Sequence, residues 1–260
     1  MNRRLHARAA LLPGGWRRDV AIDIDATGHI LAVQPDASDK NAELLAGPAI
    51  PAMPNVHSHA FQRALAGRTG PVADSRGDSF WTWRDAMYAF LRRVDADAFG
   101  AIAAQAYLEM AKAGYATVGE FHYVHHDPEG KAYADPAELA RRIVAAAEEI
   151  GLGLTLLPVF YAHAGFGGAE ITDDQRRFAQ SIDSYARLVS TLSAAASERR
   201  FTIGIAPHSL RAGHVPLTLP EGNALVVESA DTVPSALHVN PLSSDAVALV
   251  AAIDLIGDAG

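Results

Sequence analysis

The chain has 260 residues, of which 49% are hydrophobic and 20% charged, as expected for a folded domain with an apolar core. A formal net charge of −8 argues against a general nucleic-acid binder, and no apolar run reaches the roughly 18 residues that a membrane span needs. Cysteine is absent, which excludes disulfides and thiolate metal sites. The apolar run at residues 9–12 is too short for a signal peptide, so we expect a cytoplasmic protein.

Charge is distributed unevenly along the chain. All 22 Lys and Arg residues lie at or before Arg211, and every charged side chain beyond it is acidic. This change predicts that residues 213–260 form a different kind of segment. Near the other end, alternating residues 20–33 with a Thr27-Gly28 turn predict a β-hairpin within an N-terminal β segment, residues 1–48.

Residues 49–212 repeat a pattern of strand, polar loop and helix. Capping-box candidates, Asp135 with Glu138 and Thr172 with Gln175, are expected to begin two of the helices, and residues 97–113 have helical spacing. Strands are predicted at 49–56, 115–121, 152–160 and 201–206.

Strands that alternate with helices predict an α/β fold with a parallel sheet. Polar residues gather after the strands, where a (β/α)8 barrel keeps its active site. A doubly wound sheet also binds ligands there, but no glycine-rich dinucleotide motif follows the first strand. With four clear strands, the sequence predicts a partial (β/α)8 TIM-like barrel after a small N-terminal β segment.

His57 and His59 are the strongest chemical feature. Side chains two apart on an extended segment point to the same side, so both imidazoles would converge at the end of the first barrel strand. Such a pair also arises by chance in a chain with 11 His, but this position favours half of a metal site.

Three further groups of residues could serve a substrate. Residues 120–126 hold Glu120 and Tyr123 at a strand end, either facing the site or forming a solvated loop. His208 could polarise a substrate and Arg211 could bind an anion, or the two could be structural. Residues 78–84 form a predicted loop, either a lid in which Arg84 is an anion clamp or an apolar plug over the barrel end with Arg84 exposed.

Together these motifs resemble the formimidoylglutamate deiminases of the amidohydrolase superfamily. The matching strings are LHARAALLPGGW at 5–16, MPNVHSHAFQRA at 53–64, DSFWTWR at 78–84, EFHY at 120–123 and PHSLR at 207–211. The resemblance covers about residues 5–212. It implies a cytoplasmic enzyme of histidine degradation that hydrolyses N-formimino-L-glutamate to N-formyl-L-glutamate and ammonia.

The resemblance also implies roles for individual residues. His57 and His59 would bind one divalent metal ion, zinc or iron, and His208 would act in catalysis. Gln62, Arg84, Tyr123, His208 and Arg211 would contact the substrate, with the arginines suited to its two carboxylates. The expected partner is this small molecule, with a homodimer as a candidate assembly; neither nucleic acid nor membrane is expected.

The chain departs from the family pattern after residue 212. The family's third metal-binding His and its acid–base Glu are missing in their usual context: His238 is the one candidate ligand, and Pro241 stands where the Glu is expected. We therefore expect a truncated or frame-shifted product whose activity is open. The alternatives are another amidohydrolase-type deaminase and a non-catalytic metal-binding fragment.

Overall fold

The computed structural model divides the chain into two compact units, Met1–Met53 and Pro54–Gly260. The described residues are 2–69, 80–199, 201–209, 212, 216–218 and 224–226. Most of the segment predicted to be atypical, 213–260, lies outside them.

The first unit is a four-stranded sheet in the order β3-β2-β1-β4. Its strands are β1 (Arg3–Leu12), β2 (Gly15–Ile24), β3 (Ile30–Gln34) and β4 (Glu43–Leu44). β2 and β3 pair antiparallel, which confirms the predicted hairpin, and Gly28 takes the positive φ of 94° that its turn requires. Small residues, Ala7, Ala10 and Val20, form the core of this sheet.

The second unit is built on a parallel sheet in the order β5-β6-β7-β8. The strands are β5 (Met53–Ser58), β6 (Tyr115–His122), β7 (Gly153–Phe160) and β8 (Phe201–Ile203), and the short β9 (Ala206–Pro207) also pairs with β7. All four predicted strands are confirmed, although the last is interrupted where Gly204 N–H donates to the Leu156 carbonyl. β10 (Pro216–Thr218) and β11 (Ala224–Val226) form a separate antiparallel pair.

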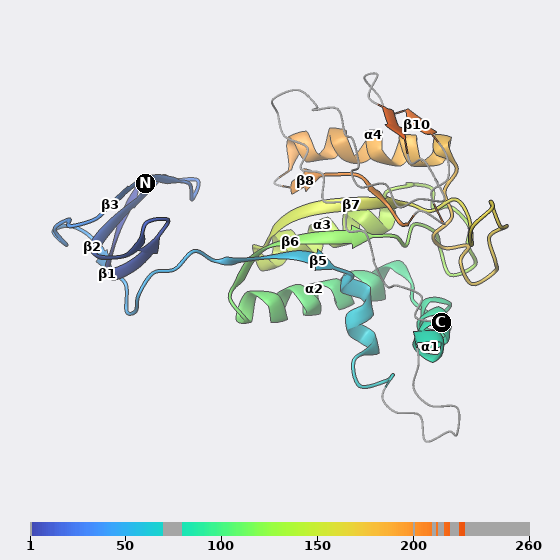
Figure 1. The fold of residues 1–260 in the computed structure, drawn as a ribbon, viewed down its shortest axis with the longest axis horizontal. Coiled ribbons are helices and arrows are strands. Elements are labelled where there is room, and N and C mark those ends of the chain that lie inside the picture. Colours follow the sequence, from blue (N-terminus) through green and yellow to red (C-terminus); the bar gives the residue numbers. More distant parts are fainter. Residues whose placement is uncertain are drawn as a thin grey trace. The chain divides into compact units, whose positions relative to one another are not determined.

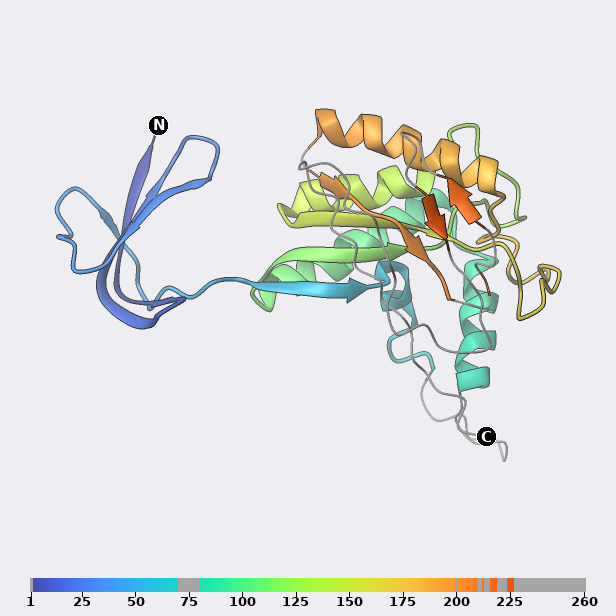
Figure 2. The ribbon, with the colours of Figure 1, turned by 45° about the horizontal axis from the view of Figure 1, so that its top comes forward.

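Helices follow these strands along the chain, as β/α units require. They are the 3-10 helix η1 (Ala60–Leu65), α1 (Phe80–Leu91), α2 (Ala96–Lys112), α3 (Glu138–Ile150) and α4 (Ile182–Glu198). Figures 1 and 2 show α2, α3 and α4 running alongside the parallel sheet. Their apolar faces pack with the strands into a large core and a smaller cluster between α4 and β7, and the described strands do not close a barrel. No helix in the described ranges is long and apolar enough to cross a bilayer.

The predicted helix start, with Asp135 as its cap, is wrong by two residues. The Asp135 carboxylate accepts from Ala137 N–H (2.9 Å), but residues 136 and 137 form a turn, and α3 begins at Glu138. Glu138 does not reach back to complete a capping box, because its carboxylate binds Arg142 one turn later (2.9 Å).

The helix predicted from Thr172 also begins later, at Ile182. Gln175 Oε1 does accept from Thr172 N–H (3.1 Å), but this contact closes a turn. The capping box that begins α4 joins Ser181 and Ser184, each side chain accepting from the other's backbone N–H. Both sites satisfy a backbone donor locally, so the pattern alone did not distinguish turn from helix.

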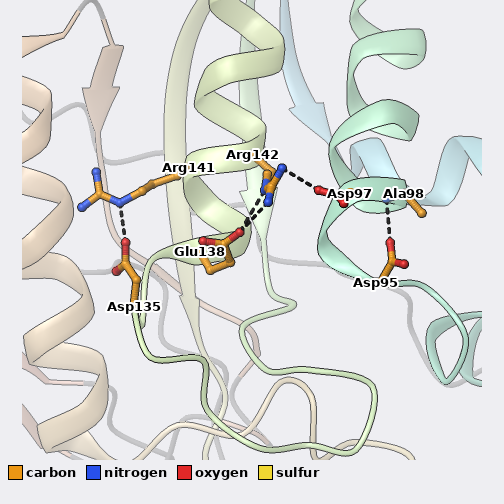
Figure 3. A network of polar contacts seen from close by, with 7 residues as sticks. All are labelled: Asp95, Asp97, Ala98, Asp135, Glu138, Arg141 and Arg142. Atoms are coloured by element: carbon orange, nitrogen blue, oxygen red, sulfur yellow. Dashed lines mark hydrogen bonds and ion pairs between the residues drawn. The ribbon is translucent and has the colours of Figure 1, made fainter.

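A polar network joins the beginnings of α2 and α3 (Figure 3). Arg142 lies between Glu138 and Asp97, with both ion pairs at 2.8 Å. Asp95 accepts from Ala98 N–H (2.8 Å) and is the N-cap of α2. The Asp97 side chain is 85% exposed, so its ion pair is screened by water, whereas the cap satisfies an otherwise unpaired helix donor.

These contacts predict unequal costs for two neighbouring substitutions. We expect Asp95→Ala to lower the free energy of unfolding by about 1 kcal/mol, because it removes the N-cap acceptor. Asp97→Ala serves as the matched control and should cost less than about 0.5 kcal/mol. Urea unfolding followed by circular dichroism measures both; an equal or larger loss for Asp97→Ala would contradict this ranking.

Candidate metal and substrate site

His57 and His59 converge at the end of β5. His57 belongs to the strand, His59 follows it directly, and their Nε2 atoms lie 3.0 Å apart with the rings edge to face. Two zinc–nitrogen bonds of about 2.0–2.1 Å at a tetrahedral angle place the nitrogens roughly 3.3 Å apart. The separation is close to that value, so the two rings fit a shared cation.

A second contact fixes the tautomer of His59. Its Nδ1 lies 3.1 Å from the Phe121 carbonyl oxygen on β6. Because a carbonyl only accepts, Nδ1 carries the proton and Nε2 presents a lone pair toward His57. Metal-binding histidines are commonly oriented in this way by a backbone carbonyl on the far nitrogen.

Aromatic rings connect this pair to the end of β9. The Phe121 ring stacks on His57 at 6.0 Å, and the Tyr123 ring is 5.2 Å from His59 and 5.9 Å from His208. Tyr161, just after β7, contacts the His208 ring at 4.6 Å. The fold thus gathers residues from four successive strand ends into one cluster, as a barrel mouth requires.

Gln62 and Tyr123 form the polar part of this cluster. Gln62 Nε2, from η1, donates to the Tyr123 hydroxyl (2.8 Å), which donates in turn to Met87 Sδ on α1 (3.4 Å). Burial raises the pKa of Tyr123 well above its usual value, so the phenol stays neutral and can donate a hydrogen bond.

Arg84 lies on a helix, so the prediction of a loop at this position is wrong. In α1 its guanidinium stacks over the Trp81 ring at 4.4 Å and lies 5.7 Å from the Tyr88 ring. Its Nε is buried without a hydrogen-bond partner among the described residues, so a donor remains for an anion. Arg84 is one turn from Met87, the residue that touches Tyr123.

Residues 120–126 do not all face the cluster, contrary to one of the two readings of this segment. Strand alternation sends Phe121 and Tyr123 toward the histidines and turns Glu120 and His122 toward α2. Glu120 is buried, which raises its pKa, and its carboxylate accepts from Tyr107 (3.1 Å) and Ala60 N–H (2.7 Å).

The loop histidines His125 and His126 serve the fold. Their Nε2 atoms lie within hydrogen-bond distance of the backbone carbonyls of Val159 (2.9 Å) and Ala179 (2.7 Å). Each ring therefore ties the segment after β6 to another part of the second unit.

No group of three or more potential metal ligands occurs among the described residues. His57 and His59 are two potential ligands, and the candidate third ligand, His238, lies outside the described residues, as does Arg211. The contacts of Phe121 and Met87 were not predicted, since apolar residues in a strand and a helix give no chemical signal in sequence.

The chain is similar in sequence to known proteins. Residues 2–46 match the family described as "Formimidoylglutamate deiminase HutF, N-terminal domain". A formimidoylglutamate deiminase from Pseudomonas aeruginosa is 47% identical over 236 residues, which cover 90% of this chain and 51% of that protein.

Solved structures share the fold. An amidohydrolase from Brucella melitensis superimposes with a TM-score of 0.74 at 42% identity, over 81% of this chain and 47% of that one. Atrazine chlorohydrolase from Arthrobacter aurescens, complexed with zinc, gives a TM-score of 0.56 at 16% identity, over 78% and 46% of the two chains. The chain thus spans about half the length of the relatives it matches.

The buried histidines next to the site predict a pH-dependent stability. Burial lowers the pKa of His125 to about 4 and that of His122 well below its usual value. The folded chain keeps these rings neutral while the unfolded chain binds protons near pH 6.5, so stability falls as pH drops from about 6.5 to 4. For His125 alone the full loss is about 3 kcal/mol.

Urea unfolding between pH 7.5 and 4.5 measures this effect. We expect His125→Gln, whose amide can still donate to Val159, to flatten the decline, and the exposed His29→Gln control to leave it unchanged. Identical slopes for His125→Gln and the parent chain would refute this assignment.

Proposed function

We propose that this chain, a relative of the formimidoylglutamate deiminases, supplies the metal-binding strand and substrate-binding groups for hydrolysis of N-formimino-L-glutamate to N-formyl-L-glutamate and ammonia. The observation that carries the proposal is the convergence of His57 and His59 beside Tyr123 and His208. The 47% identity to the deiminase from Pseudomonas aeruginosa supports this substrate class.

His57 and His59 would hold one divalent ion, with zinc as the first candidate and iron as the second. The chlorohydrolase of similar fold was solved with zinc, and imidazole nitrogens suit both metals. When bound, such an ion supplies Lewis-acid polarisation and lowers the pKa of water toward neutrality.

The chain's own groups would bind and orient the substrate. Arg84 keeps a buried donor for a carboxylate, and Arg211 is proposed for the second one. Gln62 fixes the neutral Tyr123 hydroxyl, which would donate a hydrogen bond to the formimino group. The imidazole of His208 would donate a second hydrogen bond and keep the formimino nitrogen protonated during hydrolysis.

A second candidate function is metal binding without turnover. It is favoured by the grouping of only two potential ligands within the described ranges, whereas catalytic zinc usually has three protein ligands plus water. A deaminase of the same superfamily with another substrate is the third candidate, and the donor on Arg84 favours an anionic one.

One set of assays separates these functions. The purified chain is analysed for bound zinc and iron and for ammonia release from formiminoglutamate. We expect stoichiometric metal that is lost in His57→Ala and His59→Ala, and a KM that rises at least about tenfold in Arg84→Gln, since a bidentate charged contact is removed. Arg93→Gln, an exposed neighbour just beyond α1, is the control.

The outcomes divide the three candidates. Metal with turnover supports the deiminase, and metal without turnover excludes it and leaves the second and third candidates. Absence of metal from the folded chain would refute all three. Turnover that is insensitive to Arg84→Gln would refute its carboxylate contact.

A further inference from the structure

The segment that carries the two histidines is held by a buried carboxylate that sequence analysis did not assign to this role. Glu120 is 1% exposed and accepts from Ala60 N–H at 2.7 Å and from the Tyr107 hydroxyl at 3.1 Å. The Ser58 hydroxyl also hydrogen-bonds to it. Ser58 and Ala60 are the immediate neighbours of His59, so one carboxylate binds both sides of this ligand.

The same segment is held at His57 by Asn55. The Asn55 side-chain oxygen accepts from His57 N–H (3.2 Å), and its amide donates to Met110 Sδ on α2 (3.4 Å). Glu120 likewise reaches α2 through Tyr107. The backbone around both histidines is therefore anchored to one helix from the side opposite the aromatic rings.

This anchoring matters because, among the described strands, β5 has a neighbour on one side only. β5 is the edge strand of the described parallel sheet, and the His57 side chain is exposed. A buried carboxylate is costly unless its lone pairs are used, and here three donors use them. Two of these hydrogen bonds stabilise the turn from Ser58 to Ala60, and the conformation of this turn determines where the His59 ring lies.

We propose that Glu120 is a positioning residue for the metal site: by fixing the turn from Ser58 to Ala60, it sets the spacing of the His57 and His59 Nε2 atoms and thereby the affinity for a divalent cation. The inference rests on the proposed function in requiring that this pair binds metal. A purely structural anchor would change stability but not the affinity of the folded chain.

Cobalt binding by the full chain tests the proposal. Co²⁺ is titrated while its visible d–d absorption reports both affinity and coordination geometry. Glu120→Leu removes both carboxylate oxygens, and we expect it to weaken Co²⁺ binding at least about tenfold and to change the absorption spectrum. Loss of the groups that hydrogen-bond to metal ligands has effects of this size at other metal sites. Glu120→Gln keeps one oxygen for Ala60 N–H and should restore most of the affinity.

Glu109→Leu is the matched control. Glu109 also binds the segment after His59, through Arg63 of η1 at 2.5 and 2.7 Å, but it is part-exposed and does not contact the ligand turn. Its Co²⁺ affinity and spectrum should equal those of the parent chain. Equal affinities for folded Glu120→Leu and Glu109→Leu would overturn the proposal.

Two further measurements keep the test decisive. Should Glu120→Leu fail to fold, Ser58→Ala removes a single donor and should weaken Co²⁺ binding about threefold or more; no change would overturn the proposal. Should the parent chain bind no Co²⁺, the proposed function fails, and amide hydrogen exchange then decides. Exchange at Ala60 at least about tenfold faster in Glu120→Leu than in Glu109→Leu, or faster in Ser58→Ala where Glu120→Leu does not fold, supports positioning, and unchanged exchange refutes it.

Discussion

The close pairing of β5 with β6 is the constraint on which the rest of the site depends. A Cβ at Gly119 would lie 3.1 Å from the Val56 carbonyl oxygen, so glycine lets the two backbones approach here. This approach brings the Phe121 carbonyl within reach of His59 Nδ1 and the Glu120 carboxylate within reach of Ala60 N–H. The pairing of β5 with β6 thus fixes both the tautomer of His59 and the turn that carries this residue.

Alternation along β6 then divides two tasks between its faces. Phe121 and Tyr123 line the histidine cluster, while Glu120 and His122 lie in the core against α2. The first face presents aromatic surfaces and a neutral phenol to the histidine cluster. The second face fixes the backbone around His59 from the core side, where burial makes the loss of each hydrogen bond costly. Chemical and mechanical roles therefore alternate within four consecutive residues.

Sequence alone predicted the strands and the placement of His57, His59, Tyr123 and His208 at their ends, because parallel strands bring their carboxyl ends together. It failed where one local pattern serves two structures: the Thr172–Gln175 contact closes a turn. It also failed at Arg84, which was expected in a loop and lies in α1. The role of Glu120 depends on Tyr107 and Ala60, which lie 13 and 60 positions away, so a local pattern could not reveal it.

A site held in this way is largely formed before any third ligand contributes. The two imidazoles come from one strand end, their spacing is within a few tenths of an ångström of a tetrahedral pair, and carboxylate and amide contacts fix the backbone beneath them. Preorganisation of this kind lowers the entropic cost of bringing ligands together, so a third ligand would join a pair of imidazoles that is already in position. Under the proposed function, the β5–β6 pairing and its support from α2 would therefore set metal affinity first, and the residues that complete the coordination would add to it.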